Sequence, residues 1–218
     1  MSQLLSGHNH GHTISNRPVA RQQTAQDVVI GRQAEILADI TAPGVGAAIW
    51  QRNPHTSFQT WIDALAVEQL PNLRVTVPVE LAEEAVRTAC KIAKTPPGPE
   101  QKMLAGDVGA LALIYGDVMK TDYVQIRLDV SDGAMCPKFH LDNVPARLLC
   151  TYRGPGTEYV PEIHRQEPER IRTMNTGSVG LFRGATWASG ERSSLLHRSP
   201  GAQAASGPRL LLVIDAAA

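Results

Sequence analysis

Residues 123–130 read Tyr-Val-Gln-Ile-Arg-Leu-Asp-Val, and this stretch decides the fold because its apolar side chains recur at every second position. Alternation over about four to eight residues is the pattern of a strand with one buried face. Similar short runs follow, separated by turns rich in glycine and proline. The further strands are expected at 138–142, 146–152, 179–183, 194–197 and 210–214. Such a series is typical of an antiparallel sandwich or barrel.

The chain before residue 121 has a different pattern. Residues 27–120 look mainly helical, with one short alternating strand expected at 45–52. The clearest helix is LAEEAVRTACKIAK at 81–94, because it is rich in Ala, Glu and Lys and is followed by a proline-rich breaker. A second helix is expected at 101–118, although three glycines weaken it. Helices first and strands afterwards indicate an α+β protein, with 27–218 forming one globular unit.

Residues 1–26 are polar and contain few large apolar side chains, so we expect a disordered N-terminal tail. Within it, His8, His10 and His12 alternate with Asn9 and Gly11. Alternating imidazoles can bind Zn(II), Ni(II) or Cu(II). The tail is therefore either a solvated segment with adventitious metal affinity or a segment that senses or loads metal.

The composition excludes several classes of protein. Lys+Arg and Asp+Glu are equal at 21 each, so the net charge of zero favours neither nucleic acid nor an anionic membrane as a partner. The longest apolar runs, such as 210–214, are far shorter than the roughly 18 residues of a membrane span. Three cysteines without a CxxC pair suit a reducing cytoplasm. The sequence also contains no G-x-S-x-G elbow, no phosphate-binding P-loop and no GxGxxG.

A histidine and a carboxylate stand two residues apart in the expected strand 138–142, at His140 and Asp142. On a strand both side chains point to one face, so both could reach one metal ion. His197 follows on a later strand, and Arg209 heads the last one. Two histidines and one carboxylate on one face of an octahedral ion are the ligands of non-haem Fe(II) oxygenases. An arginine nearby could bind the carboxylate of a co-substrate in a bidentate manner.

Arg147 and Arg153 lie close to this group in the sequence. They could bind an anion at the site. Alternatively they are solvated, or paired with Glu158 or Glu162.

The ordered set of His140, Asp142, His197 and Arg209 resembles the signature of 2-oxoglutarate- and Fe(II)-dependent oxygenases, which is carried by a double-stranded β-helix. Two other stretches, CPKFHLDNVPARLLCTYRGPGTEYV at 136–160 and the GLFRG…W segment at 180–187, resemble the DUF1826 family of bacterial proteins. The second resemblance extends from about residue 30 to the C-terminus. It also implies a connection with zinc homeostasis.

The oxygenase resemblance implies a role for each residue. His140, Asp142 and His197 would bind Fe(II), and Arg209 would pair with the distal carboxylate of the co-substrate 2-oxoglutarate. In that superfamily a hydroxyl often adds a hydrogen bond to the same carboxylate, and Tyr152, Thr151 or Ser199 could supply it. The fold implied is an N-terminal helical segment, 27–120, packed on a jelly-roll or cupin-like double-stranded β-helix at 121–218.

Two functions from different classes remain open at this point. The first is an Fe(II)/2-oxoglutarate-dependent oxygenase that hydroxylates a small molecule or a protein. The second is a non-catalytic zinc-binding protein, which would need a closed site with four ligands or affinity in His8, His10 and His12. A structural protein in which His140 and Asp142 only form hydrogen bonds is the third and simplest alternative.

Overall fold

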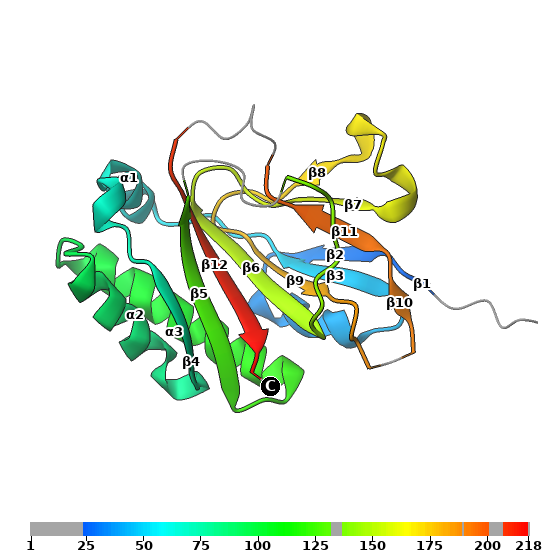
Figure 1. Cartoon of the computed structure of the whole chain (residues 1–218), viewed down its shortest axis with the longest axis horizontal. Helices are drawn as coiled ribbons and strands as arrows, with labels where there is room; N and C mark the ends of the chain where they lie inside the picture. Colours follow the sequence, from blue (N-terminus) through cyan, green and yellow to red (C-terminus); the bar gives the residue numbers. More distant parts are fainter. Residues whose placement is uncertain (1–23, 132–136, 189, 201–206, 218) are drawn as a thin grey trace, which may run out of the picture.

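The structure is a computed structural model that describes residues 24–131, 137–188, 190–200 and 207–217. Its main element is a seven-stranded sheet in the order β2-β3-β9-β6-β12-β5-β4 (Figure 1). Neighbouring strands are antiparallel except for β2 and β3. The strands are Asp27–Gly31 (β2), Val45–Trp50 (β3), Leu73–Pro78 (β4), Tyr123–Ser131 (β5), Ala146–Arg153 (β6), Val179–Arg183 (β9) and Arg209–Ala216 (β12).

A smaller antiparallel sheet has the order β11-β7-β8, and a separate parallel pair joins β1 to β10. An isolated bridge between His140 and His197 adds one residue to the side of β11 that faces away from β7. From β5 onward the chain passes repeatedly between the large and the small sheet. These strands are Thr24–Ala25 (β1), Glu158–Pro161 (β7), Arg172–Thr173 (β8), Arg192–Ser193 (β10) and Leu195–Arg198 (β11).

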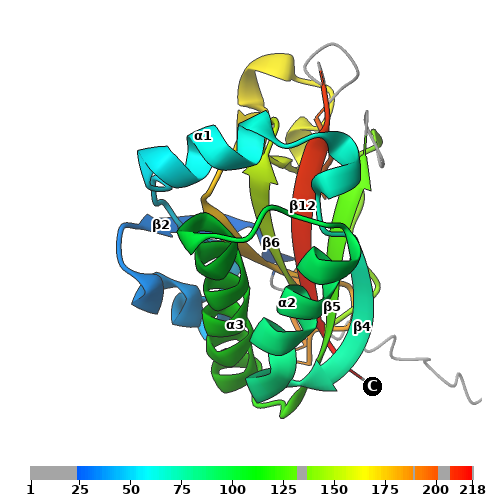
Figure 2. The same ribbon diagram turned by 90° about the vertical axis from the view of Figure 1, so that its left-hand side faces the viewer.

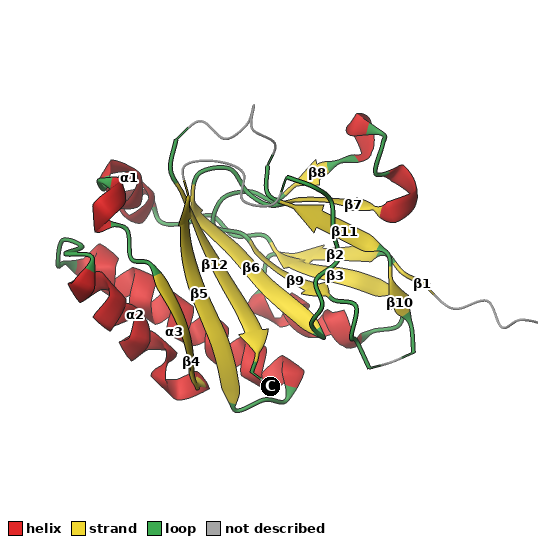
Figure 3. Ribbon diagram, viewed as in Figure 1, coloured by secondary structure: helices red, strands yellow, loops and turns green. Residues whose placement is uncertain are grey.

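Three α-helices lie on one side of the large sheet, and the small sheet lies on the other (Figure 3). Figure 2 shows α2 in front of β12 and β5, with α3 to its left. The helices are Thr56–Ala64 (α1), Ala82–Ile92 (α2) and Pro99–Met119 (α3), and short 3-10 segments occupy Ala34–Thr41, Val67–Gln69, Val79–Leu81, Glu162–His164 and Pro168–Arg170. Within the described ranges, no helix is both long and apolar enough to cross a membrane.

Alternate residues of β12 belong to two separate apolar clusters. Leu210, Leu212 and Ile214 join the larger cluster, which also contains side chains of all three α-helices. Leu211 and Val213 join a smaller cluster on the opposite face. A strand that is buried on both faces carries apolar residues at every position. This explains why residues 210–214 are continuously apolar and do not alternate.

Tyr115 connects α3 with the two central strands. Its hydroxyl donates a hydrogen bond to the carbonyl oxygen of Ala146 (2.8 Å) and accepts one from the backbone amide of Ala216 (2.7 Å). Ala146 begins β6 and Ala216 ends β12. One buried side chain therefore joins the helix to both strands.

Most expected elements are confirmed, within a few residues at their ends. The helices at 81–94 and 101–118 are α2 and α3, and the second begins with Pro99, whose missing amide proton costs nothing in the first turn of a helix. The strand expected at 138–142 is wrong, because only residue 140 pairs, through the bridge. The predicted boundary at residue 120 does not separate helices from strands, since β2, β3 and β4 precede it and join the large sheet.

Candidate metal centre

His140 and His197 face each other across the antiparallel bridge. The backbone amide of His140 donates to the carbonyl of His197 (3.0 Å), and the amide of His197 donates to the carbonyl of His140 (3.1 Å). Directly opposed residues of an antiparallel pair place their side chains on the same face. The two imidazole centroids accordingly lie 4.7 Å apart. The pairing of β11 with the bridge, and not an i, i+2 relation along one strand, brings the histidines together.

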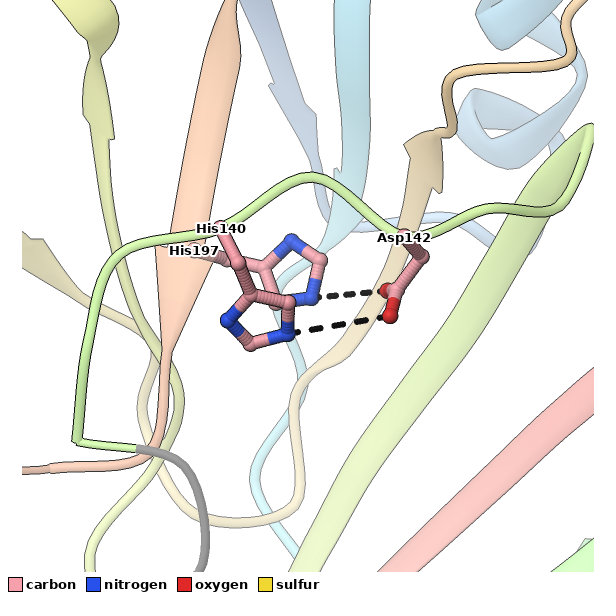
Figure 4. A group of neighbouring side chains, drawn as sticks. All are labelled: His140, Asp142 and His197. Atoms are coloured by element: carbon pink, nitrogen blue, oxygen red, sulfur yellow. Dashed lines mark ion pairs between the residues drawn. The ribbon is translucent and has the colours of Figure 1, made fainter.

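Asp142 reaches the same place from the loop that follows the bridge. Its carbonyl oxygen accepts a hydrogen bond from the amide of Ala185 (2.8 Å), and a Cβ atom on Gly184 would lie 2.8 Å from that oxygen, so the close approach requires glycine. Its Oδ2 lies 2.9 Å from Nε2 of His197, and its Oδ1 lies 3.7 Å from Nε2 of His140 (Figure 4). One potential ligand atom from each residue lies within 4.8 Å of the others.

The backbone around His140 favours the tautomer that a metal needs. Its Nδ1 lies 2.9 Å from the carbonyl oxygen of Lys138, which can only accept, so Nδ1 carries the proton of the neutral ring. The lone pair of Nε2 is then free on the side of Asp142. Histidine ligands usually donate their second N–H to a carbonyl or carboxylate in this way.

Arg147 holds the carboxylate of Asp142 from the large sheet. Its Nη1 donates to Oδ1 of Asp142, while its Nε and Nη2 donate to the two oxygens of Asp215 at 2.8 and 2.7 Å. Arg147 on β6 and Asp215 on β12 are paired directly in the register of the sheet. The bidentate pair fixes the guanidinium, which in turn fixes the direction of the Asp142 carboxylate.

The charge around Asp142 keeps it ionised. Burial by itself would raise the pKa of this carboxyl, but the close contacts with His140 and His197 and the charge of Arg147 hold the pKa well below its ordinary value. The contact with Asp142 in turn raises the pKa of His140. The site therefore provides one anionic oxygen ligand at neutral pH.

These residues fit a divalent cation. Oδ2 of Asp142 is buried and has no hydrogen-bond partner among the described residues, although Nε2 of His197 is close to it. A buried carboxylate oxygen without a partner is costly, and an ion between the two atoms would remove that cost. Imidazole nitrogen and carboxylate oxygen are ligands that suit Fe(II) and related metals.

Arg209 is a buried cation without a matching anion. It is 2% exposed, and among the described residues no carboxylate lies within ion-pair distance of it. Its Nε donates to the carbonyl of Pro155 (2.9 Å), and its Nη2 donates to the hydroxyls of Thr151 (3.0 Å) and Thr157 (3.4 Å). Its Nη1 is buried and has no partner in the described part of the chain. Burial lowers the pKa of Arg209 to about 10, and the charge of Asp129, which forms no ion pair with it, acts in the opposite direction.

A cavity of about 100 Å³ lies beside the two candidate histidines. Its lining includes both histidines, Arg147 and Thr157. Thr157 accepts a hydrogen bond from Arg209, so the cavity borders the histidines and a direct neighbour of the guanidinium. Leu149, Leu211 and Val213 supply apolar walls, and Arg127, Asp129, Arg198 and Ser199 complete the lining.

The hydroxyls proposed from the sequence lie in different places. Thr151 contacts Arg209, and Ser199 lines the cavity. The structure does not bring Tyr152 to the site: its hydroxyl donates to Asp107 (2.7 Å) on the helical side of the sheet. Neighbouring residues of β6 point to opposite faces, so Thr151 and Tyr152 cannot both face Arg209.

The partners of Arg147 and Arg153 differ from those considered in the sequence analysis. Arg147 pairs with two aspartates and not with Glu158 or Glu162, while Arg153 donates to the carbonyl of Leu65 (2.7 Å). Asp215 lies 68 positions from Arg147, and no local pattern links the two. The tail histidines His8, His10 and His12, and with them nearly all of the segment 1–26, lie outside the described residues.

The fold resembles that of a solved dioxygenase with little sequence identity to this chain. The structure is similar to that of dioxygenase for auxin oxidation 1 from Arabidopsis thaliana in a binary complex with 2-oxoglutarate, with a TM-score of 0.52 and 10% sequence identity over 87% of this chain and 91% of that chain. Dioxygenase for auxin oxidation from rice matches with a TM-score of 0.48 and 14% identity, over 88% of this chain and 83% of that chain. The shared architecture is the jelly roll of the 2-oxoglutarate-dependent oxygenases.

The family follows from the sequence itself. The family model described as "Protein of unknown function (DUF1826)" matches residues 31–215. The chain therefore belongs to the DUF1826 family. No curated protein matches the chain in sequence.

Proposed function

We propose that the protein is an Fe(II)- and 2-oxoglutarate-dependent oxygenase built on a double-stranded β-helix, with the helical segment packed on its large sheet. One observation carries the proposal: His140, Asp142 and His197 converge beside a cavity whose lining also includes Thr157, a hydrogen-bond partner of Arg209, and Arg209 is a buried guanidinium with a nitrogen that has no partner among the described residues. A metal site alone would not explain a buried cation without an anion, whose burial is costly.

The three ligands would hold Fe(II) on one side and leave its other positions open for a bidentate 2-oxo acid and for O₂. When bound, the iron would supply oxidative chemistry that transfers an oxygen atom to a substrate C–H bond, coupled to decarboxylation of the co-substrate. The side chain of His140 is 35% exposed, whereas those of Asp142 and His197 are 8% and 5% exposed. A substrate, either a small molecule or a group on a protein, would therefore approach past His140.

Arg209 would bind the distal carboxylate of 2-oxoglutarate through the unpartnered Nη1. The hydroxyls of Thr151 and Thr157 already orient its Nη2 and can also donate to an anion that enters. Leu211 and Val213 lie along the cavity and would contact the methylene groups of the co-substrate. Their apolar surface excludes water, which strengthens the ion pair in the bound state.

Arg147 would act as a positioning residue. It occupies Oδ1 of Asp142 and leaves Oδ2 directed at His197. Asp142 would then bind the metal through a single oxygen. A coordination position that a bidentate carboxylate would use is kept available for the co-substrate.

The test is an anaerobic titration of the purified protein with Fe(II), in the presence and absence of 2-oxoglutarate. We expect a weak visible charge-transfer band only when both are present. His197→Ala should abolish the band, and His164→Ala, which alters a histidine outside the site, should preserve it. Arg209→Met should weaken the response to 2-oxoglutarate while metal binding persists, and Arg74→Met is its matched exposed control.

The zinc-handling alternative gives a different result. It predicts tight Zn(II) binding, no band with Fe(II) and 2-oxoglutarate, and no effect of Arg209→Met. Such a result would overturn the oxygenase proposal. In the described part of the chain, the three converging residues provide one metal ligand fewer than a closed zinc site needs.

A further inference from the structure

A second and larger cavity, of about 430 Å³, lies on the helical side of the large sheet. Its walls include Phe58 from α1, Met103 and Gly106 from α3, and Tyr152 from β6. Because Tyr152 and Thr151 point to opposite faces of β6, the sheet itself separates this cavity from the candidate metal centre. Nothing in the proposed oxygenase function uses it.

Gly106 opens the cavity from the side of α3. A Cβ atom built on this glycine would meet no heavy atom within 4 Å. Glycine inside a helix costs about 1 kcal/mol relative to alanine, and neither a positive φ nor a close contact requires it here. The missing side chain instead leaves free volume next to the rings of Phe58 and Tyr152, whose centroids are 6.0 Å apart.

Arg52, Asp107 and the hydroxyl of Tyr152 form a polar group in the wall, which also includes Asn53 and His55. Arg52 donates to both oxygens of Asp107, each at 2.6 Å, and the hydroxyl of Tyr152 donates to the same carboxylate at 2.7 Å. The Nε of Arg52 donates to the carbonyl of Gly177 (2.7 Å), and the guanidinium stacks 4.7 Å from the ring of Trp50. These contacts fix the polar group in one geometry.

The charge of this polar group selects the kind of molecule that can bind. The positive charge of Arg52 and the negative charge of Asp107 cancel. A charged ligand would therefore lose its hydration on entering the cavity and find no opposite charge there to compensate. One N–H on Nη1 of Arg52 has no partner among the described residues, and the Asp107 oxygens keep lone pairs for another donor. The pair of Arg52 and Asp107 therefore offers one donor and one acceptor beside the apolar side chains of Phe58 and Met103.

We infer that this cavity is a binding site for a small, uncharged and mainly apolar molecule that carries a hydrogen-bonding group. Its volume lies within the roughly 300–1,000 Å³ typical of small-molecule sites, which are apolar with a few convergent polar groups. The apolar body would fill the space beside Gly106, and its polar group would contact Arg52 and Asp107. The site is independent of the metal centre.

Two dyes that share one skeleton test this inference. N-phenyl-1-naphthylamine is uncharged, and 8-anilinonaphthalene-1-sulfonate adds a sulfonate to the same rings. We expect the full chain to bind the uncharged dye at least tenfold more tightly, measured by fluorescence titration. No saturable binding of the uncharged dye, or tighter binding of the anionic one, would overturn the inference.

Two variants locate the binding. Gly106→Leu fills the cavity and should lower the affinity for the uncharged dye at least tenfold, with no loss of thermal stability because leucine favours the helix. Ala110→Leu, on an exposed position of the same helix, should leave the affinity unchanged. Equal dye binding by both variants would place the dye elsewhere and refute the site.

Asp107→Asn tests the role of charge. It leaves Arg52 as a cation without its counter-charge. The ratio of the affinity for the uncharged dye to that for the sulfonated dye should therefore fall at least tenfold. Circular dichroism verifies that the variant is folded. An unchanged preference in a folded variant would show that Arg52 and Asp107 do not select the ligand.

Discussion

Two buried arginines on the large sheet have opposite surroundings. Arg183 on β9 is 1% exposed and each of its nitrogens has a partner: it donates to the carbonyls of Ile40 and Ala42, pairs with Glu191 at 2.5 Å and stacks on Trp187. Arg209 on β12 is 2% exposed, yet among the described residues its hydrogen-bond partners are a carbonyl and two hydroxyls, and one of its nitrogens has none. Arg183 and Arg209 are therefore equally buried, but within the described residues the charge of Arg183 is paired with a carboxylate and the charge of Arg209 is not.

This difference indicates that Arg183 stabilises the fold, whereas Arg209 is available to bind an anionic ligand. A buried cation whose partners all belong to the protein stabilises the structure only while those partners remain. A buried cation without an anion costs free energy in the unliganded protein and recovers it when an anion binds. The following substitutions use this contrast, from the largest expected effect to the smallest.

Arg183→Met should cause the largest loss of stability. It removes the arginine from the carbonyl of Ile40, and it leaves the Ala42 carbonyl and the Glu191 carboxylate with only the backbone amides of Val45 and Gly44. Removing one partner of such a pair costs about 3–5 kcal/mol. The free energy of unfolding from urea titration measures this loss. Arg192→Met removes an exposed pair and should cost about 0–1 kcal/mol. Equal losses in the two variants would contradict the structural role of Arg183.

Arg209→Met should act in the opposite direction on the unliganded protein. Removing an uncompensated buried charge is expected to leave the free energy of unfolding unchanged or to raise it by about 1–3 kcal/mol. Affinity for 2-oxoglutarate in the presence of Fe(II) should fall about 100-fold, the value of one or two charge-assisted hydrogen bonds. Calorimetric titration measures the affinity. A loss of stability like that of Arg183→Met would make Arg209 a structural residue.

Arg147→Lys should weaken metal binding without removing a ligand. Lysine keeps the charge but cannot bond Asp215 in a bidentate manner and Asp142 at the same time. Loss of such a supporting contact typically lowers metal affinity about 10–100-fold. Anaerobic Fe(II) titration measures it, and Arg153→Lys on the same strand is the control. Unchanged affinity in Arg147→Lys would show that Asp142 needs no positioning.

The pH dependence of the metal-free protein should show the smallest effect. Because the folded-state pKa of Asp142 is lowered, its ionised form stabilises the fold above the ordinary pKa of about 4, and this contribution is lost as the pH falls further. Asp142→Asn should therefore be less stable than the natural chain at pH 7, by about 1.5 kcal/mol. The difference should shrink between pH 4 and pH 2. A gap that stays constant with pH would assign the loss to packing.

The sequence predicts elements better than it predicts which face of a strand a residue occupies. The alternation at 123–130 identifies β5 because its polar residues mark one face. Residues 146–152 include buried apolar side chains on both faces of the central strand β6, Leu148 on one and Leu149 on the other, so the pattern did not show whether Thr151 or Tyr152 lies beside Arg209. β4 at Leu73–Pro78 was not predicted, although Leu73, Val75 and Val77 alternate with polar residues; it is an edge strand that ends in proline.

The sequence identified the three candidate ligands, but the strand geometry from which His140 and Asp142 were inferred is wrong. His140 and Asp142 were expected to share one face of a strand, whereas the structure joins His140 to His197 by a bridge and brings Asp142 in from a loop. Residue type and order were enough to name the three residues. The bond from Arg147 to Asp215 depends on the register of β6 and β12, which local sequence does not encode.

The position of β12 has a consequence for synthesis on the ribosome. This strand is the last to be made among those of the large sheet, yet it lies between β5 and β6. Until residues 209–216 have left the exit tunnel, β5 and β6 present unpaired edges, and neither Arg209 nor Asp215 is in place. Such non-local pairing folds slowly and exposes strand edges to aggregation. A nascent chain stalled before Arg209 should therefore depend on chaperones that shield those edges.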